Sequence, residues 1–420
     1  MIRVLIAEDS AFMRKVLSDL FTRQEDFEVL DTAVNGKDAV EKAKRLRPDL
    51  MTLDVNMPVM DGLEALKIIM QECPLPVLMF SSLTQEGAEA TIRALELGAV
   101  DFQSKIGGSI SKIEPIGDEI LAKARAAAEV NVMALANVAS MGVKKQENVP
   151  SMQKHIEMPK RAGFRTEERT NPLMSGGTRK LKPVKTMSNP FLPKKRELPK
   201  RAEPLFQPAA RKVPQHTPAG GVVRMGACPS GARKIVAIGT STGGPKALQN
   251  VITKLPGNLP CGVVIVQHMP TGFTKSLAER LDSISEVSVK EAENHDIVEP
   301  GHVYIAPGNY HLTVQPKGSQ REIILNQDPP LASHRPAVDI MFNSVVQFGK
   351  DVVSVIMTGM GCDGAAGMKK IKAAGGYIIA ESEETSVVYG MPKAVVDMGI
   401  ADEVVPVYDI ARAIVDAVKK

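Results

Sequence analysis

The stretch "KIVAIGTSTGGP", from Lys234 to Pro245, joins a run of small apolar residues to a loop of glycines and hydroxyls. The apolar run predicts a buried strand, and Pro245 is typical of the first turn of a helix. Strands that alternate with helices in this way indicate an α/β domain with a parallel sheet. The loop between them either cradles a phosphate or presents Ser241 as a nucleophile.

The glycine spacing of this loop disfavours a phosphate-binding role. A dinucleotide fingerprint requires G-x-G-x-x-G and an acid about 20 residues further on, and a P-loop requires a lysine. The loop reads GTSTGG from Gly239 to Gly244, with neither the G-x-G spacing nor the lysine. The next predicted strand ends in Gln267 and His268, where a ribose-binding acid would stand. Nucleotide binding is therefore the weaker interpretation.

A nucleophilic role fits the residues that follow the other strands. His268 comes directly after the strand "CGVVIVQ", and Asp363 lies in the turn "TGMGCDGAAG" after the strand "VVSVIM". Side chains at the carboxyl ends of strands in one parallel sheet can meet. A serine needs an imidazole to take its proton, and the imidazole needs a carboxylate to fix its tautomer. We therefore predict a catalytic triad of Ser241, His268 and Asp363. Backbone amides of the Ser241 turn or of the Gly359–Gly361 loop are the candidates for an oxyanion hole.

Taken singly, these residues have ordinary structural explanations, because a histidine often ends a strand and Asp-Gly is a common turn. Cys362 beside Asp363 has no nucleophile motif around it, so we expect a buried, inert thiol. His334 and Arg335, in "ASHRPAVD", either line a substrate pocket or cap the following helix, and the sequence favours neither.

The first 122 residues also alternate apolar strands with helical periodicity, which predicts a second parallel sheet with helices on both faces. Glu8 and Asp9 follow its first strand, and Asp54 follows its third. Clustered carboxylates suit a hard cation such as Mg²⁺. Ser81 ends the fourth strand and Lys105 follows the fifth. A carboxylate nucleophile, a metal ion and a positioned ammonium group together indicate phosphoryl acceptance.

The segment between these two regions has a different composition. Between residues 141 and 234 there are 21 Lys or Arg and 6 Asp or Glu, so the rest of a chain whose net charge is +4 is about 11 units negative. The segment is also rich in proline and lacks a sustained period, which predicts a disordered linker. Its charge serves solubility or attracts an acidic partner; nucleic acid is the weakest choice, since aromatic residues for base stacking are few.

Cysteine usage and hydropathy indicate a cytoplasmic protein. The four cysteines have neither disulfide nor metal-ligand spacing, which fits a reducing compartment. The N-terminal apolar run is too short for a signal peptide. No run approaches the roughly 20 apolar residues of a membrane helix, so we expect no membrane insertion.

Residues 1 to 122 resemble the receiver domain of response regulators over their whole length. The resemblance implies that Asp54 is phosphorylated and that Glu8 and Asp9 help to hold Mg²⁺. It also implies that Lys105 contacts the phosphate, and that Ser81 and Phe102 take the places of the switch hydroxyl and the switch aromatic residue. Ile106 stands where receivers usually carry a proline.

The motifs "IGTSTGGP", "VQHMPTGFT", "YIAPG", "SHRPAVD", "MTGMGCDGAAGM" and "VVYGMPKAV" resemble the catalytic domain of the CheB family, the chemotaxis receptor methylesterases. The resemblance implies the same triad, Ser241, His268 and Asp363, without a cofactor for the hydrolase. It also implies hydrolysis of glutamate γ-methyl esters on chemotaxis receptors, deamidation of receptor glutamines, and a chemotaxis histidine kinase as phosphodonor. In this family the unphosphorylated receiver packs over the active site.

We therefore expect two α/β domains joined by a linker. Residues 1–122 are expected to form a flavodoxin-like receiver with a five-stranded parallel sheet. Residues 123–232 are expected to form the basic, Pro-rich linker. Residues 233–420 are expected to form a doubly wound, Rossmann-like hydrolase domain with a β-hairpin insertion. The expected activity is phosphorylation-activated serine hydrolysis. Two alternatives are a related hydrolase that acts on another signalling protein and a non-catalytic binding protein under phosphorylation control.

Overall fold

The computed structural model describes residues 1–105, 113–130 and 234–420, which belong to one compact unit. Ile106 and residues 131–233, which make up most of the predicted linker, lie outside the described residues.

The N-terminal domain is a five-stranded parallel sheet with the order β2-β1-β3-β4-β5. This confirms the predicted fold. Its strands are β1 (Ile2–Ala7), β2 (Phe27–Ala33), β3 (Leu50–Asp54), β4 (Val77–Ser81) and β5 (Asp101–Ser104). Its helices are α1 (Ala11–Thr22), α2 (Gly36–Leu46), α3 (Gly62–Glu72), α4 (Gln85–Leu97) and α5 (Ile113–Ala128). Helix α5 runs through residue 122, where the sequence analysis places the domain boundary.

Polar residues set where the first four of these helices begin. Ser10, Asn35, Asp61 and Thr84 each stand just before a helix, and each side chain accepts a hydrogen bond from the amide three residues further on. Replacing such a cap with alanine typically costs about 1 kcal/mol. Helix α4 ends at Gly98, whose φ of 114° is a left-handed conformation that favours glycine.

Alternating apolar residues cover both faces of this sheet. In β1, Leu5 packs on the side of α2, α3 and α4, while Val4 and Ile6 pack on the side of α1 and α5. Because successive side chains of a strand point to opposite faces, a strand buried on both faces is apolar throughout.

The C-terminal domain is a seven-stranded sheet with the order β14-β13-β12-β6-β7-β9-β8, and all of its pairs are parallel. Its strands are β6 (Ile235–Thr240), β7 (Gly262–Gln267), β8 (Ser288–Glu291), β9 (His302–Ile305), β12 (Val352–Ile356), β13 (Tyr377–Glu381) and β14 (Glu403–Val405). The predicted hairpin insertion is present as β10 (His311–Lys317) and β11 (Gln320–Asn326), which pair antiparallel. The helical elements are α7 (Gly244–Ile252), α8 (Phe273–Asp282), α9 (Val338–Val345), the 3-10 helix η2 (Val346–Asp351), α10 (Ala365–Ala373), α11 (Met391–Asp397) and α12 (Val407–Lys419).

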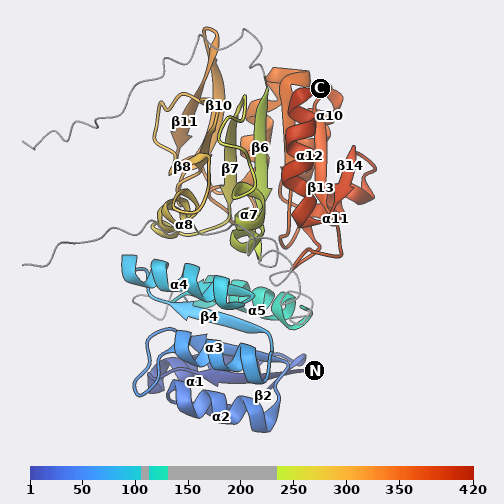
Figure 1. Cartoon of the computed structure of the whole chain (residues 1–420). Helices are drawn as coiled ribbons and strands as arrows, with labels where there is room; N and C mark the ends of the chain where they lie inside the picture. The colour runs from blue at the N-terminus through green and yellow to red at the C-terminus, as the bar shows by residue number, and fades with distance from the viewer. Residues whose placement is uncertain (106–112, 131–233) are drawn as a thin grey trace, which may run out of the picture. The chain divides into compact units, whose positions relative to one another are not determined.

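Helices lie on both faces of this second sheet, as Figure 1 shows. Helices α7, α8 and α12 pack on one face, where Val236 and Ile238 of β6 are buried. Helices α9, α10 and α11 and the β10–β11 hairpin pack on the other face, against Ile235 and Ala237. The central position of β6 brings the loop that follows it between the loops after β7 and β12.

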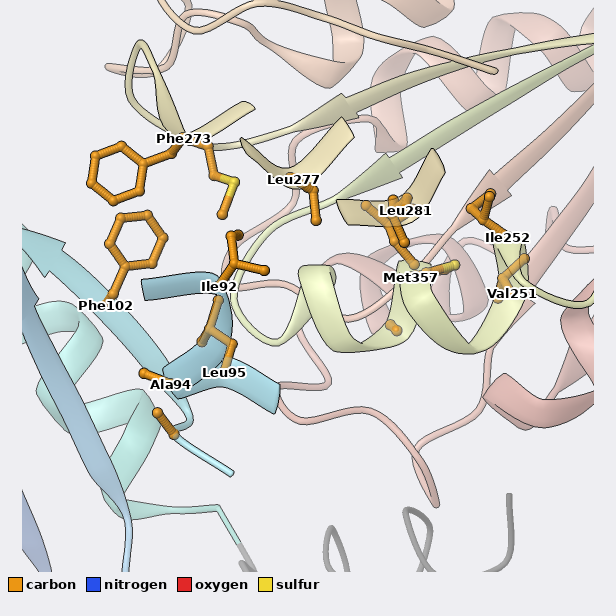
Figure 2. Packing of buried hydrophobic residues seen from close by; sticks show 14 of the residues in the cluster. Ile92, Ala94, Leu95, Phe102, Val251, Ile252, Phe273, Leu277, Leu281 and Met357 are labelled. Carbon is orange, nitrogen blue, oxygen red and sulfur yellow. The ribbon is translucent and has the colours of Figure 1, made fainter. Parts of the chain in front are cut away.

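One apolar cluster continues from α4 of the first domain into α7 and α8 of the second. Figure 2 shows Ile92 and Leu95 of α4 in the same cluster as Leu277 and Leu281 of α8. The rings of Phe102 and Phe273 stack at 4.8 Å between centroids. Buried apolar surface therefore holds α4 of the first domain against α8 of the second.

Across residues 1–105, 113–130 and 234–420, each helix is too short or too polar to cross a lipid bilayer.

Candidate active site and acidic site

The loop after β6 turns sharply and leaves Ser241 at the carboxyl end of the sheet. Gly243 adopts a φ of 78°, and a Cβ at this position would lie 2.5 Å from the side chain of Val387. Only glycine fits both the left-handed backbone and this close approach. Helix α7 begins at the next residue, with Pro245 in its first turn. The predicted strand, turn and helix are therefore present.

The structure brings the predicted triad together. His268 Nδ1 lies 3.1 Å from Ser241 Oγ, and His268 Nε2 lies 2.8 Å from Asp363 Oδ2. The three residues follow β6, β7 and β12, which are neighbours in the sheet. In serine proteases Nε2 faces the serine and Nδ1 the aspartate, so this ring is turned the other way. The chemistry is preserved, since one nitrogen faces the hydroxyl and the other is held by the carboxylate.

The N-terminus of α9 fixes the Asp363 carboxylate. Its Oδ2 accepts a hydrogen bond from the amide of Val338 at 2.7 Å, and its Oδ1 accepts one from the amide of Asp339 at 2.8 Å. Burial alone would raise the pKa of Asp363, but the hydrogen bonds from His268 and from these two amides hold it below its usual value. A helix N-terminus also favours negative charge. Asp363 is thus held as an anion beside the imidazole.

Buried hydrogen bonds connect the turn that carries Ser241, through Thr358, to the end of β13. The carbonyl of Thr358 accepts a hydrogen bond from the amide of Ser241 at 3.0 Å, and the Thr358 hydroxyl donates to the carbonyl of Thr242 at 2.9 Å. The amide of Thr358 donates to Glu381 Oε2 at 2.8 Å. Glu381 is fully buried, and this burial raises its pKa to about 7.

The side chain of Gln267 links the backbones of Ser241 and His268. Its Nε2 donates to the carbonyl of Ser241 at 2.9 Å and to the carbonyl of His268 at 3.2 Å. The residue is 2% exposed. The last residue of β7 therefore fixes the backbone of both loops.

A cavity of about 200 Å³ opens onto Ser241 and His268. His334 and Arg335 line it, which supports the pocket interpretation of these two residues. The capping interpretation is wrong, because the first amides of α9 donate to Asp363 instead.

The expectation of a buried thiol at Cys362 is wrong. Cys362 is exposed. It follows Gly361, whose φ of 80° turns the chain just before Asp363 points into the site. The turn that directs the carboxylate inward leaves the neighbouring thiol in solvent.

The first domain carries the predicted acidic cluster. Ligand atoms of Glu8, Asp9 and Asp54 lie within 4.8 Å of one another, and Glu8 and Asp54 are buried. Burial and the neighbouring Asp54 raise the pKa of Glu8 to about 7, and burial also raises the pKa of Asp54. Crowded carboxylates of this kind suit a divalent cation with oxygen ligands, because its charge would offset their repulsion.

Lys105 completes this acidic site. Its Nζ lies 2.6 Å from Asp54 Oδ2 and 3.0 Å from Glu8 Oε2. Ser81, at the end of the adjacent β4, donates from Oγ to the carbonyl of Gly87 at 2.8 Å. Phe102 lies in β5 and is buried against Phe273 of the second domain rather than beside the acids.

Comparisons with known proteins identify both domains. Residues 236–414 match the family model described as CheB methylesterase, and residues 4–109 match the response regulator receiver domain. A protein-glutamate methylesterase/protein-glutamine glutaminase from Pyrococcus abyssi is 42% identical, over 100% of this chain and 94% of its own length. The chain belongs to the CheB methylesterase family. A relative of the same name from Geobacillus kaustophilus is 41% identical, over 99% of each chain. Among solved structures, the Thermotoga maritima CheB methylesterase catalytic domain is 48% identical, covers 44% of this chain and 97% of its own, and has a TM-score of 0.43.

The two domains are therefore a receiver domain and a CheB methylesterase domain. Three supporting features were not predicted from the sequence: the α9 amides that bind Asp363, the hydrogen bond between Thr358 and Glu381, and the ring of His334, which stacks on that of His268. The acid at the end of β13 and the histidine in "ASHRPAVD" are visible signals, but their partners come from distant parts of the chain.

Proposed function

We propose that this chain is a phosphorylation-regulated serine hydrolase, a methylesterase and glutaminase, in which Ser241 is the nucleophile, His268 the base and Asp363 the orienting carboxylate. The observation that carries the proposal is the unbroken contact from hydroxyl to imidazole to carboxylate. A non-catalytic binding protein would not need this arrangement.

Acylation begins when His268 Nδ1 takes the proton of Ser241 as Oγ attacks the side-chain carbonyl carbon of a glutamate γ-methyl ester. Asp363 holds the Nε2–H of the ring and stabilises the imidazolium that forms. The tetrahedral intermediate then collapses, its C–O bond to the methoxy group breaks, and His268 returns the proton so that methanol leaves. A glutamyl ester of Ser241 remains.

Deacylation repeats the same chemistry with water. His268 Nδ1 takes a proton from a water molecule, the hydroxide adds to the acyl carbon, and Ser241 leaves with the proton. The product is a glutamate carboxylate. A glutamine side chain follows the same course, with ammonia as the first leaving group.

Methylated chemotaxis receptors are the substrates we propose. The Pyrococcus and Geobacillus relatives are named for action on protein glutamate and protein glutamine. We place the reaction in the cytoplasm, because Cys73, Cys261 and Cys362 are free thiols and a reducing compartment keeps cysteines unpaired.

The receiver domain gates access to the site in this proposal. Asp101, Glu119 and Lys123 of the receiver line the same cavity as Ser241 and His268. Thr242, next to the nucleophile, donates from its hydroxyl to Asp101 Oδ2 at 2.7 Å, and this contact is buried. A glutamyl side chain on a protein can reach Ser241 only after these receiver residues move away.

Asp54 is the residue we propose to be phosphorylated, by a chemotaxis histidine kinase. Glu8, Asp9 and Asp54 would hold Mg²⁺, which supplies charge neutralisation at the phosphoryl group when bound. Lys105 lies where it can contact the phosphate. The new group adds roughly −1.5 to −2 charge beside Lys105. Ser81 and Phe102 would couple this change to the interface, because Phe102 stacks on Phe273.

Replacing Asp54 with alanine tests the gate. We expect Asp54→Ala to keep a low basal release of methanol from methylated receptor membranes and to gain nothing from a small-molecule phosphodonor, since the acceptor carboxylate is gone. Methanol release is measured with and without the donor, in the presence of Mg²⁺.

The matched control is Asp19→Ala, which removes a carboxylate from the exposed ion pair with Lys15 on α1. This variant should respond to the donor as the unchanged chain does. Full stimulation of Asp54→Ala would exclude Asp54 as the acceptor. Hydrolysis of some other protein ester, with none on the receptors, would replace the proposed substrate.

A further inference from the structure

The imidazole ring of His334 lies flat against the ring of His268. Their centroids are 3.9 Å apart and their planes differ by 16°. The side chain of His268 is also buried, with only 7% of it exposed. The ring of the general base is therefore held along its edge by Ser241 and Asp363 and covered on a face by a second aromatic ring.

The backbone that carries His334 is strained. Ala332 and Ser333 have φ values of 48° and 68°, in the left-handed region that favours glycine or asparagine. The turn is closed by hydrogen bonds between the backbones of Leu331 and His334, at 3.1 Å and 2.9 Å. Two such residues in succession are strained, and strain of this kind concentrates at functional sites.

Hydrogen bonds from Arg335 connect the strained turn to Asn309 and to the segment at Gln327 and Asp328. Its Nε and Nη2 donate to Asn309 Oδ1 at 3.1 Å and 2.7 Å. Its Nη1 donates to the carbonyls of Gln327 and Asp328 at 2.9 Å and 3.0 Å. A guanidinium with several fixed acceptors is rigid, so the ring of the preceding residue is held in place as well.

We propose that His334 is a positioning residue that holds the plane of the His268 ring, so that Nδ1 stays directed at Ser241 while the proton moves. This inference rests on the proposed function of the triad. Stacked aromatic rings at this separation attract each other beyond the area they bury. The hydrogen bonds at Nδ1 and Nε2 hold the His268 ring at two points only, so the ring could still tilt about the line that joins these two atoms. The stack with His334 opposes that tilt.

A stack against a charged neighbour would oppose the reaction, since His268 becomes an imidazolium in each half of the cycle. Burial, and then the charge of His268, lowers the pKa of His334 to about 4. His334 is therefore neutral near pH 7 and presents an uncharged π face to the imidazolium.

A direct chemical role for His334 has less support. Among the described residues, its Nδ1 is buried without a hydrogen-bond partner. A proton relay would need a donor or acceptor at this atom. Stacking requires only the ring.

Two substitutions of similar bulk separate the stack from the nitrogen atoms. His334→Phe keeps a flat ring, and His334→Leu fills the space without one. Both are made in the full chain and assayed with phosphodonor and Mg²⁺ for kcat and KM on methylated receptor membranes. Each is also treated with a fluorophosphonate, and the rate of labelling at Ser241 is followed by mass spectrometry. His334→Met replaces His334→Leu if the latter does not fold, since methionine adapts to irregular space.

We expect His334→Phe to keep kcat and the labelling rate within about twofold, and His334→Leu to lower both by roughly tenfold with KM unchanged, as the loss of an aromatic pair implies. An equal loss in both variants would overturn the inference, because the nitrogen atoms would then be required. An unchanged rate in His334→Leu would overturn it too. If labelling follows this pattern while no variant or parent releases methanol, the positioning role stands and the proposed substrate falls.

Discussion

Ser241→Ala should release methanol from methylated receptors at least about 10⁴-fold more slowly than the unchanged chain, as in other enzymes that lose the serine of a triad. The substitution removes the only oxygen that His268 Nδ1 faces at hydrogen-bond distance among the described residues. The turn itself should persist, because the Ser241 backbone is held by Thr358 and Gln267. Methanol release is measured in the presence of phosphodonor, and circular dichroism checks that both domains stay folded.

The matched control for this variant is Ser283→Ala, which removes a serine hydroxyl that donates to the carbonyl of Arg280 at the end of α8. Its rate should match that of the unchanged chain. Turnover by Ser241→Ala at a comparable rate would mean that another group attacks the ester.

Asp363→Asn should lower kcat by about 10⁴-fold with little change in KM. Both oxygens of Asp363 accept hydrogen bonds: Oδ1 from the amide of Asp339, and Oδ2 from the amide of Val338 and from His268. An asparagine must turn its NH₂ group toward one of these sets of donors. Either orientation loses an acceptor, and the imidazolium loses its counter-charge. Steady-state kinetics on methylated receptor membranes, with phosphodonor present, measure the change.

Asp339→Asn is the matched control, because Asp339 stands at the same end of α9. Its Oδ1 accepts a hydrogen bond from the amide of Gly367 at 2.6 Å, and within the described part of the chain its side chain has no hydrogen bond to His268. We expect its kcat to stay within a few-fold of the parent value. A similar kcat for Asp363→Asn would mean that the ring needs no carboxylate, and the triad would have to be redrawn.

Much of this site could be predicted from the sequence, because it depends on local pattern. Apolar runs of five or six residues mark buried strands, and the residue after each run lies at the same edge of the sheet. This reasoning placed Ser241, His268 and Asp363 together, and likewise the acids of the receiver. The hairpin insertion predicted after β9 is also present, as β10 and β11.

Some features are missing from the prediction for local reasons, and others depend on contacts between distant segments. Strand β8 is short and half polar, so hydrophobic periodicity does not reveal it. Helix α3 had a usable signal, an aspartate cap at Asp61 before an apolar period, which the prediction omits. The hydrogen bond from the Thr358 amide to Glu381 joins residues more than twenty positions apart. Exposure of Cys362 follows from the direction of one turn, which composition does not encode.

Interdomain regulation depends on which receiver residues meet the catalytic loops, and periodicity says nothing about that. Phe102 shows this most clearly. The resemblance to receiver domains implies a switch residue at Phe102, and the structure buries this residue against Phe273 of the methylesterase domain. This stack is one of several contacts between the domains, with the Thr242–Asp101 hydrogen bond and the packing of α4 on α8.

The rate at which a fluorophosphonate labels the full chain, with and without phosphodonor, tests the central claim most directly. The reagent needs only an activated serine and access to it, so it reads the triad and the gate without assuming a receptor. We predict a single adduct at Ser241, formed slowly by the chain alone and faster once phosphodonor and Mg²⁺ are added. An adduct on a different residue, or a rate at Ser241 that the donor leaves unchanged, would contradict the account.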